Sequence, residues 1–293
     1  MDYQWYPGHM TKARRRMQEN LKLVDLIIEL TDARTPLSGR NPDIDSLAAG
    51  KKRILILTKA DLADEALTRR WVEYFQDKGI LAAAMDARKS GSMRQIRSLV
   101  AKAAEEKMER DRRRGIRNRP VRAMIVGIPN VGKSTFINSY AGRASAKTGN
   151  KPGVTRGEQW IRPDNTLELL DTPGILWPKF EDPQVGIRLA LTGTIRDELL
   201  QTQELSGHLI TFLEKEYPGA LNMRYGIGTR QESEGESKET AMPDAPEILR
   251  EVAEARKLIA SGGEWDMQRA AAMLIDEFRS GALGRFTLEQ PPE

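Results

Sequence analysis

Short apolar runs alternate with amphipathic segments through the first 170 or so residues of the chain. We interpret the apolar runs as strands at residues 23–30, 53–57, 80–85, 124–126, 159–162 and 166–170. Helical spacing of apolar residues predicts helices at 8–20, 67–75, 93–108 and 135–140. This alternation predicts an α/β fold with a parallel or mostly parallel sheet, helices on both faces and ligand sites at the carboxyl ends of the strands.

The pattern changes near residue 181, after which the strand signals stop. Amphipathic helices are predicted at 185–200, 204–217, 247–259 and 265–278. Residues 229–247 are too polar to bury a core and are expected to form a flexible acidic loop. We therefore expect an α/β domain with a basic N-terminal segment over residues 1–180 and an all-α domain over 181–293.

Composition narrows the chemistry that the chain can carry. It has 293 residues, no cysteine and two histidines, which excludes disulfides, thiolate metal sites and histidine-rich metal clusters. The only expected metal is therefore oxygen-bound, and Mg²⁺ fits that description. No apolar signal segment and no run of about 18 apolar residues occurs, so we expect a cytoplasmic protein without a membrane partner.

The chain has a net charge of +4, and positive residues form two basic clusters, at residues 12–16 and 110–122. Arginines at this density bind phosphates strongly, which indicates a polyanion such as RNA. A solvated helix face or a charged linker is the alternative interpretation.

A glycine-rich segment from Gly127 to Ser134 follows the apolar run 124–126 and has the spacing G-x-x-x-x-G-K-S. Small residues at this spacing let backbone N–H groups surround a phosphate. Lys133 is expected to reach the β/γ-phosphates and to assist catalysis, and Ser134 to offer its hydroxyl to Mg²⁺. The other expected phosphate-binding residues are Asn130, Val131, Gly132 and Thr135. An ordinary glycine turn is the alternative, but the preceding strand and following helix disfavour it.

The segment from Asp171 to Gly174 comes at the end of a predicted strand and has the form D-x-x-G. Its carboxylate can hold the water shell of Mg²⁺, and the N–H of Gly174 can contact a γ-phosphate. Because D-x-x-G is common, the assignment depends on its place behind the glycine-rich loop. Thr155 is the expected second hydroxyl ligand of Mg²⁺, with Thr148 as the alternative. The loop around Thr155 would then be a switch that triphosphate and metal order.

Residues 58–61, Thr-Lys-Ala-Asp, follow the strand 53–57 and have the form of a guanine-binding motif. The carboxylate of Asp61 can accept hydrogen bonds from the ring N–H and the exocyclic amine of guanine, while the stem of Lys59 lies along the base. Adenine lacks this pair of donors, so Asp61 predicts GTP over ATP. A capped helix start is the alternative.

The order of these motifs is unusual, because most GTPases carry the phosphate loop first and the guanine motif last. Binding depends on which loops meet at one sheet edge, so a moved chain break preserves the contacts. The whole chain resembles the circularly permuted ribosome biogenesis GTPases of the YlqF type. The resemblance rests on motifs at 6–10, 32–36, 58–61, 127–134, 152–156 and 171–178. It implies a bacterial cytoplasmic GTPase that binds rRNA and acts late in assembly of the large ribosomal subunit.

The chain departs from the common GTPase pattern at two places. Thr58 stands where the guanine motif usually has Asn, which removes an amide able to touch the base and brace the phosphate loop. We therefore expect modest GTP affinity. Asp86 and Ala87 replace the usual Ser-Ala of the last guanine-contacting loop, so specificity depends mainly on Asp61.

Hydrolysis needs a group that aligns the attacking water. Many GTPases use a Gln directly after D-x-x-G, but Ile175 occupies this position, so slow intrinsic turnover is expected. The resemblance nominates His9 as the water-positioning catalytic residue, although a lone histidine is often structural. Asn130 resembles the loop residue that helps to bind K⁺ in potassium-stimulated GTPases, so K⁺ joins GTP, GDP and Mg²⁺ as a candidate cofactor. His208 is expected to be structural.

We interpret the chain as a monomeric GTP-hydrolysing switch that a large ribosomal subunit precursor stimulates. The alternative is an RNA-binding assembly factor that uses GTP only as a structural ligand. The presence of Lys133, Ser134, Thr155 and Asp171 disfavours that alternative. The missing cysteine and the lack of a lipid-binding stretch disfavour a GTPase of tRNA modification or of a membrane partner.

Overall fold

The computed structural model describes residues 8–87, 89–116, 119–142, 159–174, 176–177, 180–195, 201–227 and 244–292; for residues 8–14 and 90 this covers the backbone alone. The chain forms two compact units. Residues 1–196 together with 285–293 form one, which we call the α/β unit, and residues 197–284 form the helical unit. The expected boundary lay at residue 180. The observed division falls later because α6 (Pro183–Leu191) and the loop behind it bond to the α/β unit.

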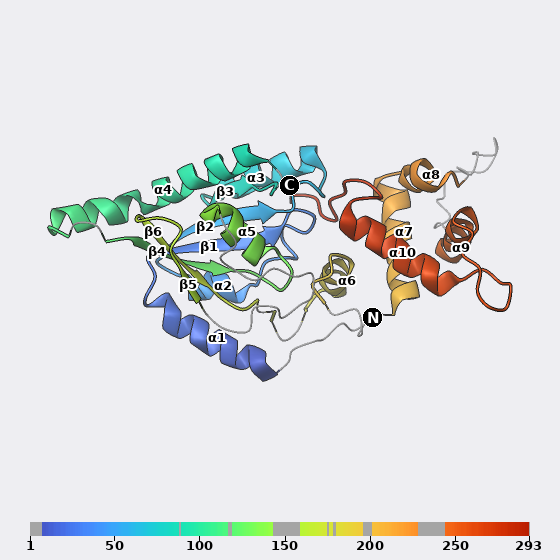
Figure 1. Cartoon of the computed structure of the whole chain (residues 1–293), viewed down its shortest axis with the longest axis horizontal. Coiled ribbons are helices and arrows are strands. Elements are labelled where there is room, and N and C mark those ends of the chain that lie inside the picture. Colours follow the sequence, from blue (N-terminus) through green and yellow to red (C-terminus); the bar gives the residue numbers. More distant parts are fainter. Residues whose placement is uncertain are drawn as a thin grey trace. The chain divides into compact units, whose positions relative to one another are not determined.

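A six-stranded sheet forms the centre of the α/β unit, in the order β3-β2-β1-β4-β6-β5 (Figure 1). Its strands are β1 (Leu26–Asp32), β2 (Lys52–Thr58), β3 (Leu81–Ala84), β4 (Val121–Val126), β5 (Gln159–Ile161) and β6 (Leu167–Asp171). All neighbours pair in parallel except β5, which is antiparallel to β6. The prediction of a mostly parallel sheet is therefore confirmed.

Helices cover the sheet because β1 is buried at every position and so must be shielded on both faces. The helices of this unit besides α6 are α1 (Gly8–Leu21), α2 (Asp43–Leu47), α3 (Glu65–Asp77), α4 (Ser90–Arg113) and α5 (Lys133–Ala141). Met17 of α1 and Ile44 of α2 pack near Ile27 of β1. The sequence pattern missed α2, because its five residues are too few to show helical periodicity.

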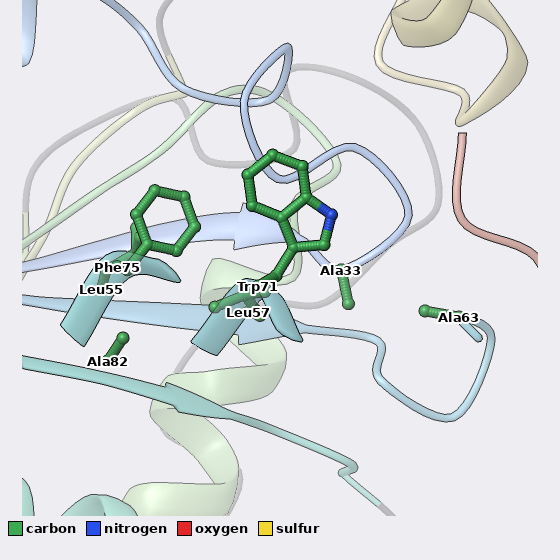
Figure 2. Packing of buried hydrophobic residues seen from close by; sticks show 7 residues of the cluster. All are labelled: Ala33, Leu55, Leu57, Ala63, Trp71, Phe75 and Ala82. Carbon is green, nitrogen blue, oxygen red and sulfur yellow. The ribbon is translucent and has the colours of Figure 1, made fainter. Parts of the chain in front are cut away.

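The aromatic residues of α3 form the core beside β2. Trp71 and Phe75 are fully buried, and their rings stack at 5.6 Å. They lie over Leu55 and Leu57 (Figure 2). Asp64 caps the helix by accepting a hydrogen bond from the Leu67 N–H at 2.8 Å. Trp71 and Phe75 are four residues apart, which places both rings on the buried face of the helix.

The helical unit contains α7 (Thr202–Glu216), α8 (Ala220–Tyr225), α9 (Ala245–Ala255) and α10 (Met267–Ser280). Helices α7, α9 and α10 pack against one another through buried residues such as Leu209, Val252 and Leu274. Residues 229–243 of the predicted acidic loop lie outside the described residues. Among the helices that the structure describes, none is both long and apolar enough to cross a membrane.

Candidate nucleotide site

The predicted motifs meet at one edge of the sheet. Strands β2, β1, β4 and β6 are successive neighbours and run parallel, so their carboxyl ends lie side by side (Figure 1). These ends carry Thr58, Asp32, the glycine-rich loop and Asp171, respectively. The sheet order therefore brings together segments that lie far apart in the sequence, as the permuted arrangement requires.

The glycine-rich loop connects β4 to α5 and wraps around its own lysine. Gly132 precedes the helix with φ 96°, a left-handed conformation that favours glycine. The buried Lys133 Nζ donates to the carbonyl oxygens of Gly127 at 3.0 Å and Ile128 at 2.7 Å. Burial, and the nearby charge of Lys59, lower the pKa of Lys133 to about 8, although Asp171 opposes this shift. An anionic phosphate would offset the cost of holding this ammonium in the loop.

The other predicted residues of this loop lie around the first turn of α5. Val131 is buried, Ser134 is half-buried and Thr135 is exposed. Asn130 has φ 61°, and its Nδ2 donates to the carbonyl oxygen of Gly193 at 2.7 Å. The loop is thereby attached to the segment that follows α6.

Asp171 lies beside the glycine-rich loop and has an unusual environment. Its side chain is buried, and its Oδ1 accepts no hydrogen bond from any described residue. Burial raises the pKa of Asp171 to about 6, and the positive charge of Lys133 only partly opposes the rise. A buried carboxylate oxygen without a donor is costly, and it is the type of group that Mg²⁺ or its bound water satisfies. The residues present therefore fit a magnesium ion.

Gly174 is packed directly against the glycine-rich loop. A Cβ atom at this position would lie 2.6 Å from the backbone N and 2.8 Å from the Cα of Pro129. Nearby, the Thr172 hydroxyl donates to the Ile125 carbonyl oxygen at 2.6 Å. Only glycine permits this approach, which places the backbone of the D-x-x-G segment on the loop.

Thr58 links the two halves of the site. Its buried hydroxyl lies 2.6 Å from the carbonyl oxygen of Val131 and 3.0 Å from that of Thr31, and its single proton can be donated to either. The amide that braces the phosphate loop in the common motif is absent, but the Thr58 hydroxyl bonds the loop backbone in its place. The expected modest GTP affinity stays a prediction.

Lys59 is held by a buried carboxylate that the motif analysis did not assign to the site. Its Nζ lies 3.0 Å from Asp32 Oδ2, and Arg34 donates to both oxygens of the same carboxylate at 3.0 and 2.8 Å. These two cations hold the pKa of Asp32 far below its ordinary value against the effect of its burial. The signal in the sequence was a carboxylate at a strand end with an arginine two residues later.

The remaining residues of the predicted guanine side lie in two joined loops. Asp61 is half-buried, and the N–H of Ala60 donates to the Met85 carbonyl oxygen at 3.1 Å. This bond places the 58–61 loop beside Asp86, which is half-buried, and Ala87, which is exposed. The structure thus brings the proposed guanine contacts together at the end of β2 and β3.

Four residues that the sequence analysis singled out cannot be located at the level of their side chains. Thr155 and its alternative Thr148 lie outside the described residues, as does Ile175. The backbone of His9 lies in α1, but its side chain is outside the described part of the chain. The second magnesium ligand and the water-positioning residue therefore stay predictions.

Comparison with known proteins gives a consistent picture. Residues 122–219 match the family described as 50S ribosome-binding GTPase. The chain is 45% identical to ribosome biogenesis GTPase A of Bacillus cereus, over 100% of this chain and 95% of that protein. The GNP-bound crystal structure of YlqF from Thermotoga maritima superposes with a TM-score of 0.66 at 27% identity, covering 96% of this chain and 99% of that one. A GDP-bound YlqF structure gives a TM-score of 0.65 at 26% identity, covering 95% and 100%.

Proposed function

The chain belongs to the ribosome biogenesis GTPase A family, and we propose that it binds GTP at the carboxyl edge of its sheet and hydrolyses it on a large ribosomal subunit precursor. As a member of this family it is a GTP-hydrolysing enzyme that acts in large-subunit assembly. What remains to be proposed is which residues perform each step and what stimulates turnover.

The nucleotide is proposed to span the loops that Thr58 joins. Its phosphates lie in the loop from Gly127 to Ser134, where Lys133 contacts them, and its base lies beside Lys59 and Asp61. The observation that carries this proposal is the hydrogen bond from Thr58 to Val131, because it couples the guanine motif to the phosphate loop. The GNP- and GDP-bound states of the related YlqF structures support guanine nucleotides as the ligands.

Mg²⁺ is proposed to be held by Ser134, Asp171 and Thr155, and the Asp171 oxygen that accepts no hydrogen bond from a described residue supports this. When bound, the ion supplies neutralisation of charge on the β- and γ-phosphates. Lys133 adds positive charge at the same phosphates, and His9 positions the attacking water. Asn130 remains the proposed residue for K⁺.

The RNA-binding surface is proposed to include two basic helical segments. On α4, the side chains of Arg112 and Arg113 are 80% and 77% exposed, and on α1 that of Arg15 is 84% exposed. Exposed arginines of this kind release counterions when they bind phosphates, so rRNA is a fitting partner. We further propose that the helical unit contributes to RNA binding and that the protein acts in the cytoplasm as a monomer.

Turnover of GTP with and without large-subunit precursor particles tests the function. We expect slow intrinsic hydrolysis, clear stimulation by the particles and no comparable use of ATP. Hydrolysis that the particles do not change would contradict the proposed switch. Tight GTP binding with negligible turnover in either condition would favour the alternative, an assembly factor that uses GTP as a structural ligand.

The guanine assignment is tested by Asp61→Asn. Loss of the carboxylate should weaken GTP binding and reduce the preference for guanine over other bases, since two hydrogen bonds to a charged acceptor are lost. Asp77→Asn, an exposed aspartate at the end of α3, is the matched control. Unchanged base preference in Asp61→Asn would refute this role.

A further inference from the structure

The last residues of the chain return to the α/β unit and lie along the proposed guanine-binding loop. We call residues 285–290 the terminal strap. They belong to the α/β unit, although the helical unit, which ends at Gly284, directly precedes them. Residues 286–289 are all buried, so the strap is part of the packed structure of the α/β unit. None of the sequence motifs assigned a role to this segment.

The strap bonds three backbone carbonyl groups of residues 60–63, where the guanine motif ends. Arg285 donates from Nη2 to the Ala60 carbonyl oxygen at 3.1 Å and from Nε to the Ala63 carbonyl oxygen at 3.0 Å. The N–H of Phe286 donates to the Leu62 carbonyl oxygen at 3.2 Å. These three carbonyl groups flank Asp61 on both sides.

The end of the strap farther from Arg285 bonds to the loop that follows β1 and to α3. The buried carboxylate of Glu289 accepts hydrogen bonds from the N–H groups of Leu37 at 2.7 Å and Ser38 at 2.9 Å. The indole N–H of Trp71 donates to the Glu289 carbonyl oxygen at 3.2 Å. The N–H of Leu288 donates to the carbonyl oxygen of Arg34, the residue that holds Asp32. The backbone of the strap that carries Arg285 is therefore held in place by hydrogen bonds.

We propose that Arg285 is a positioning residue for guanine recognition, which rests on the proposed role of Asp61 as the guanine reader. Its planar guanidinium bonds the carbonyl groups of Ala60 and Ala63 at once and so fixes the bend of the loop between them. The direction of the Asp61 carboxylate depends on that bend. Two simultaneous hydrogen bonds to the base require this direction to be held closely, whereas phosphate binding at Gly127 to Ser134 does not.

A lysine cannot replace this arginine fully. Its ammonium is a point charge on a flexible stem and lacks the fork that spans two carbonyl groups. Another arginine that contacts the strap is Arg70 of α3, whose Nη1 lies 3.4 Å from Gln290 Oε1. That contact is exposed and lies at the opposite end of the strap from the guanine-binding loop. Arg70 therefore serves as a matched control.

The test is the ratio of the Kd for IDP to the Kd for GDP, measured on the full chain by calorimetric titration. IDP lacks only the exocyclic amine of guanine, so the ratio reports how well Asp61 reads that amine. In Arg285→Ala we expect the Kd for GDP to rise about 3–10-fold and the ratio to fall about 3-fold or more, since each lost hydrogen bond contributes about 1 kcal/mol. Arg285→Lys should recover the ratio only in part, and Arg70→Ala should match the wild type.

A change in folding or in overall charge would shift both nucleotides equally and leave the ratio unchanged, and thermal unfolding checks that each variant is folded. Asp61→Asn is measured in parallel to separate the two proposals. If Asp61→Asn lowers the ratio but Arg285→Ala does not, or if Arg70→Ala lowers it as much, the role of Arg285 is refuted alone. If Asp61→Asn leaves the ratio unchanged, the guanine assignment fails, and the role of Arg285 fails with it.

Discussion

Replacing Asp171 by Asn should stabilise the nucleotide-free protein while it weakens Mg²⁺-dependent nucleotide binding. Burial raises the pKa of Asp171 from 3.8 to about 6, and no described residue donates a hydrogen bond to its Oδ1. One pKa unit corresponds to about 1.4 kcal/mol, so the ionised side chain destabilises the folded protein by about 3 kcal/mol at pH 7.5. Asn still buries an oxygen at this place, so we expect a net gain of about 1–3 kcal/mol.

The dependence on pH separates this effect from other causes. Because the pKa of Asp171 is higher in the folded than in the unfolded chain, its destabilising effect is complete above about pH 7 and fades as the pH falls through 6. Lys133 does not obscure the effect. Its pKa is lowered to about 8, so Lys133 is almost fully protonated at pH 7. Its effect on the free energy of unfolding therefore stays nearly constant at lower pH. The advantage of the Asn variant should therefore fall by about half between pH 7.5 and pH 5.

Urea unfolding of the protein in EDTA, without nucleotide, measures this difference. The gain should also raise the thermal midpoint by roughly 2–4 °C for each kcal/mol. Asp77→Asn removes an exposed carboxylate and should change stability by less than about 0.5 kcal/mol. An Asp171→Asn variant that is less stable than the wild type at pH 7.5, or a gain that does not depend on pH, would refute the reasoning.

Two further substitutions test the ends of the site. Thr58→Val removes the hydrogen bond to Val131 without changing the side-chain size, so it should lower the free energy of unfolding in urea by about 1–2 kcal/mol and weaken GDP binding. Thr58→Ser keeps the hydroxyl and should preserve both stability and GDP binding. Equal behaviour of the two variants would contradict the role of this hydrogen bond. His9→Ala should reduce particle-stimulated GTP turnover about 100-fold with the Kd for GTP nearly unchanged, and stimulated rates equal to the wild type would exclude His9 as the water-positioning group.

Much of the fold could be predicted because its strands are continuous apolar runs and its helices are amphipathic. Besides the missed short helix α2, an error lies where a local backbone turn ends a helix. We expected a helix over residues 185–200, but α6 ends at Leu191. Gly193 takes φ 76°, and the Thr194 N–H turns back to the Leu189 carbonyl oxygen at 2.9 Å. This is a left-handed helix stop that apolar spacing does not reveal.

The motif residues could be predicted because phosphate and guanine recognition need particular chemical groups at short spacing. The residues that hold these motifs in place could not be predicted, because they come from distant parts of the chain. Glu289 bonds the N–H of Ser38 across 251 residues, and no periodicity or motif links the two. The same holds for Asp32 and Lys59, which meet only because β1 and β2 pair in register, with Asp32 opposite Thr58.

The buried ion pairs of Asp32 serve to position Lys59 rather than to stabilise the fold. Removing charges from water costs about as much as their attraction returns, so such pairs add little net stability. What they do is fix Lys59, since Arg34 orients the carboxylate that holds its ammonium. Asp32 can act in this way because β1 lies between β2, which carries the guanine motif, and β4, which carries the phosphate loop.

The same geometry explains why the order of the motifs along the chain does not matter to the site. The connection from α4 to β4 reaches the amino end of β4, whereas the guanine motif and the phosphate loop lie at the carboxyl ends of β2 and β4. The two motifs contact each other through Thr58 and Val131, side chain to backbone, without using that connection. A chain that joined these elements in another order would therefore make the same contact, provided that β1 still paired with both strands.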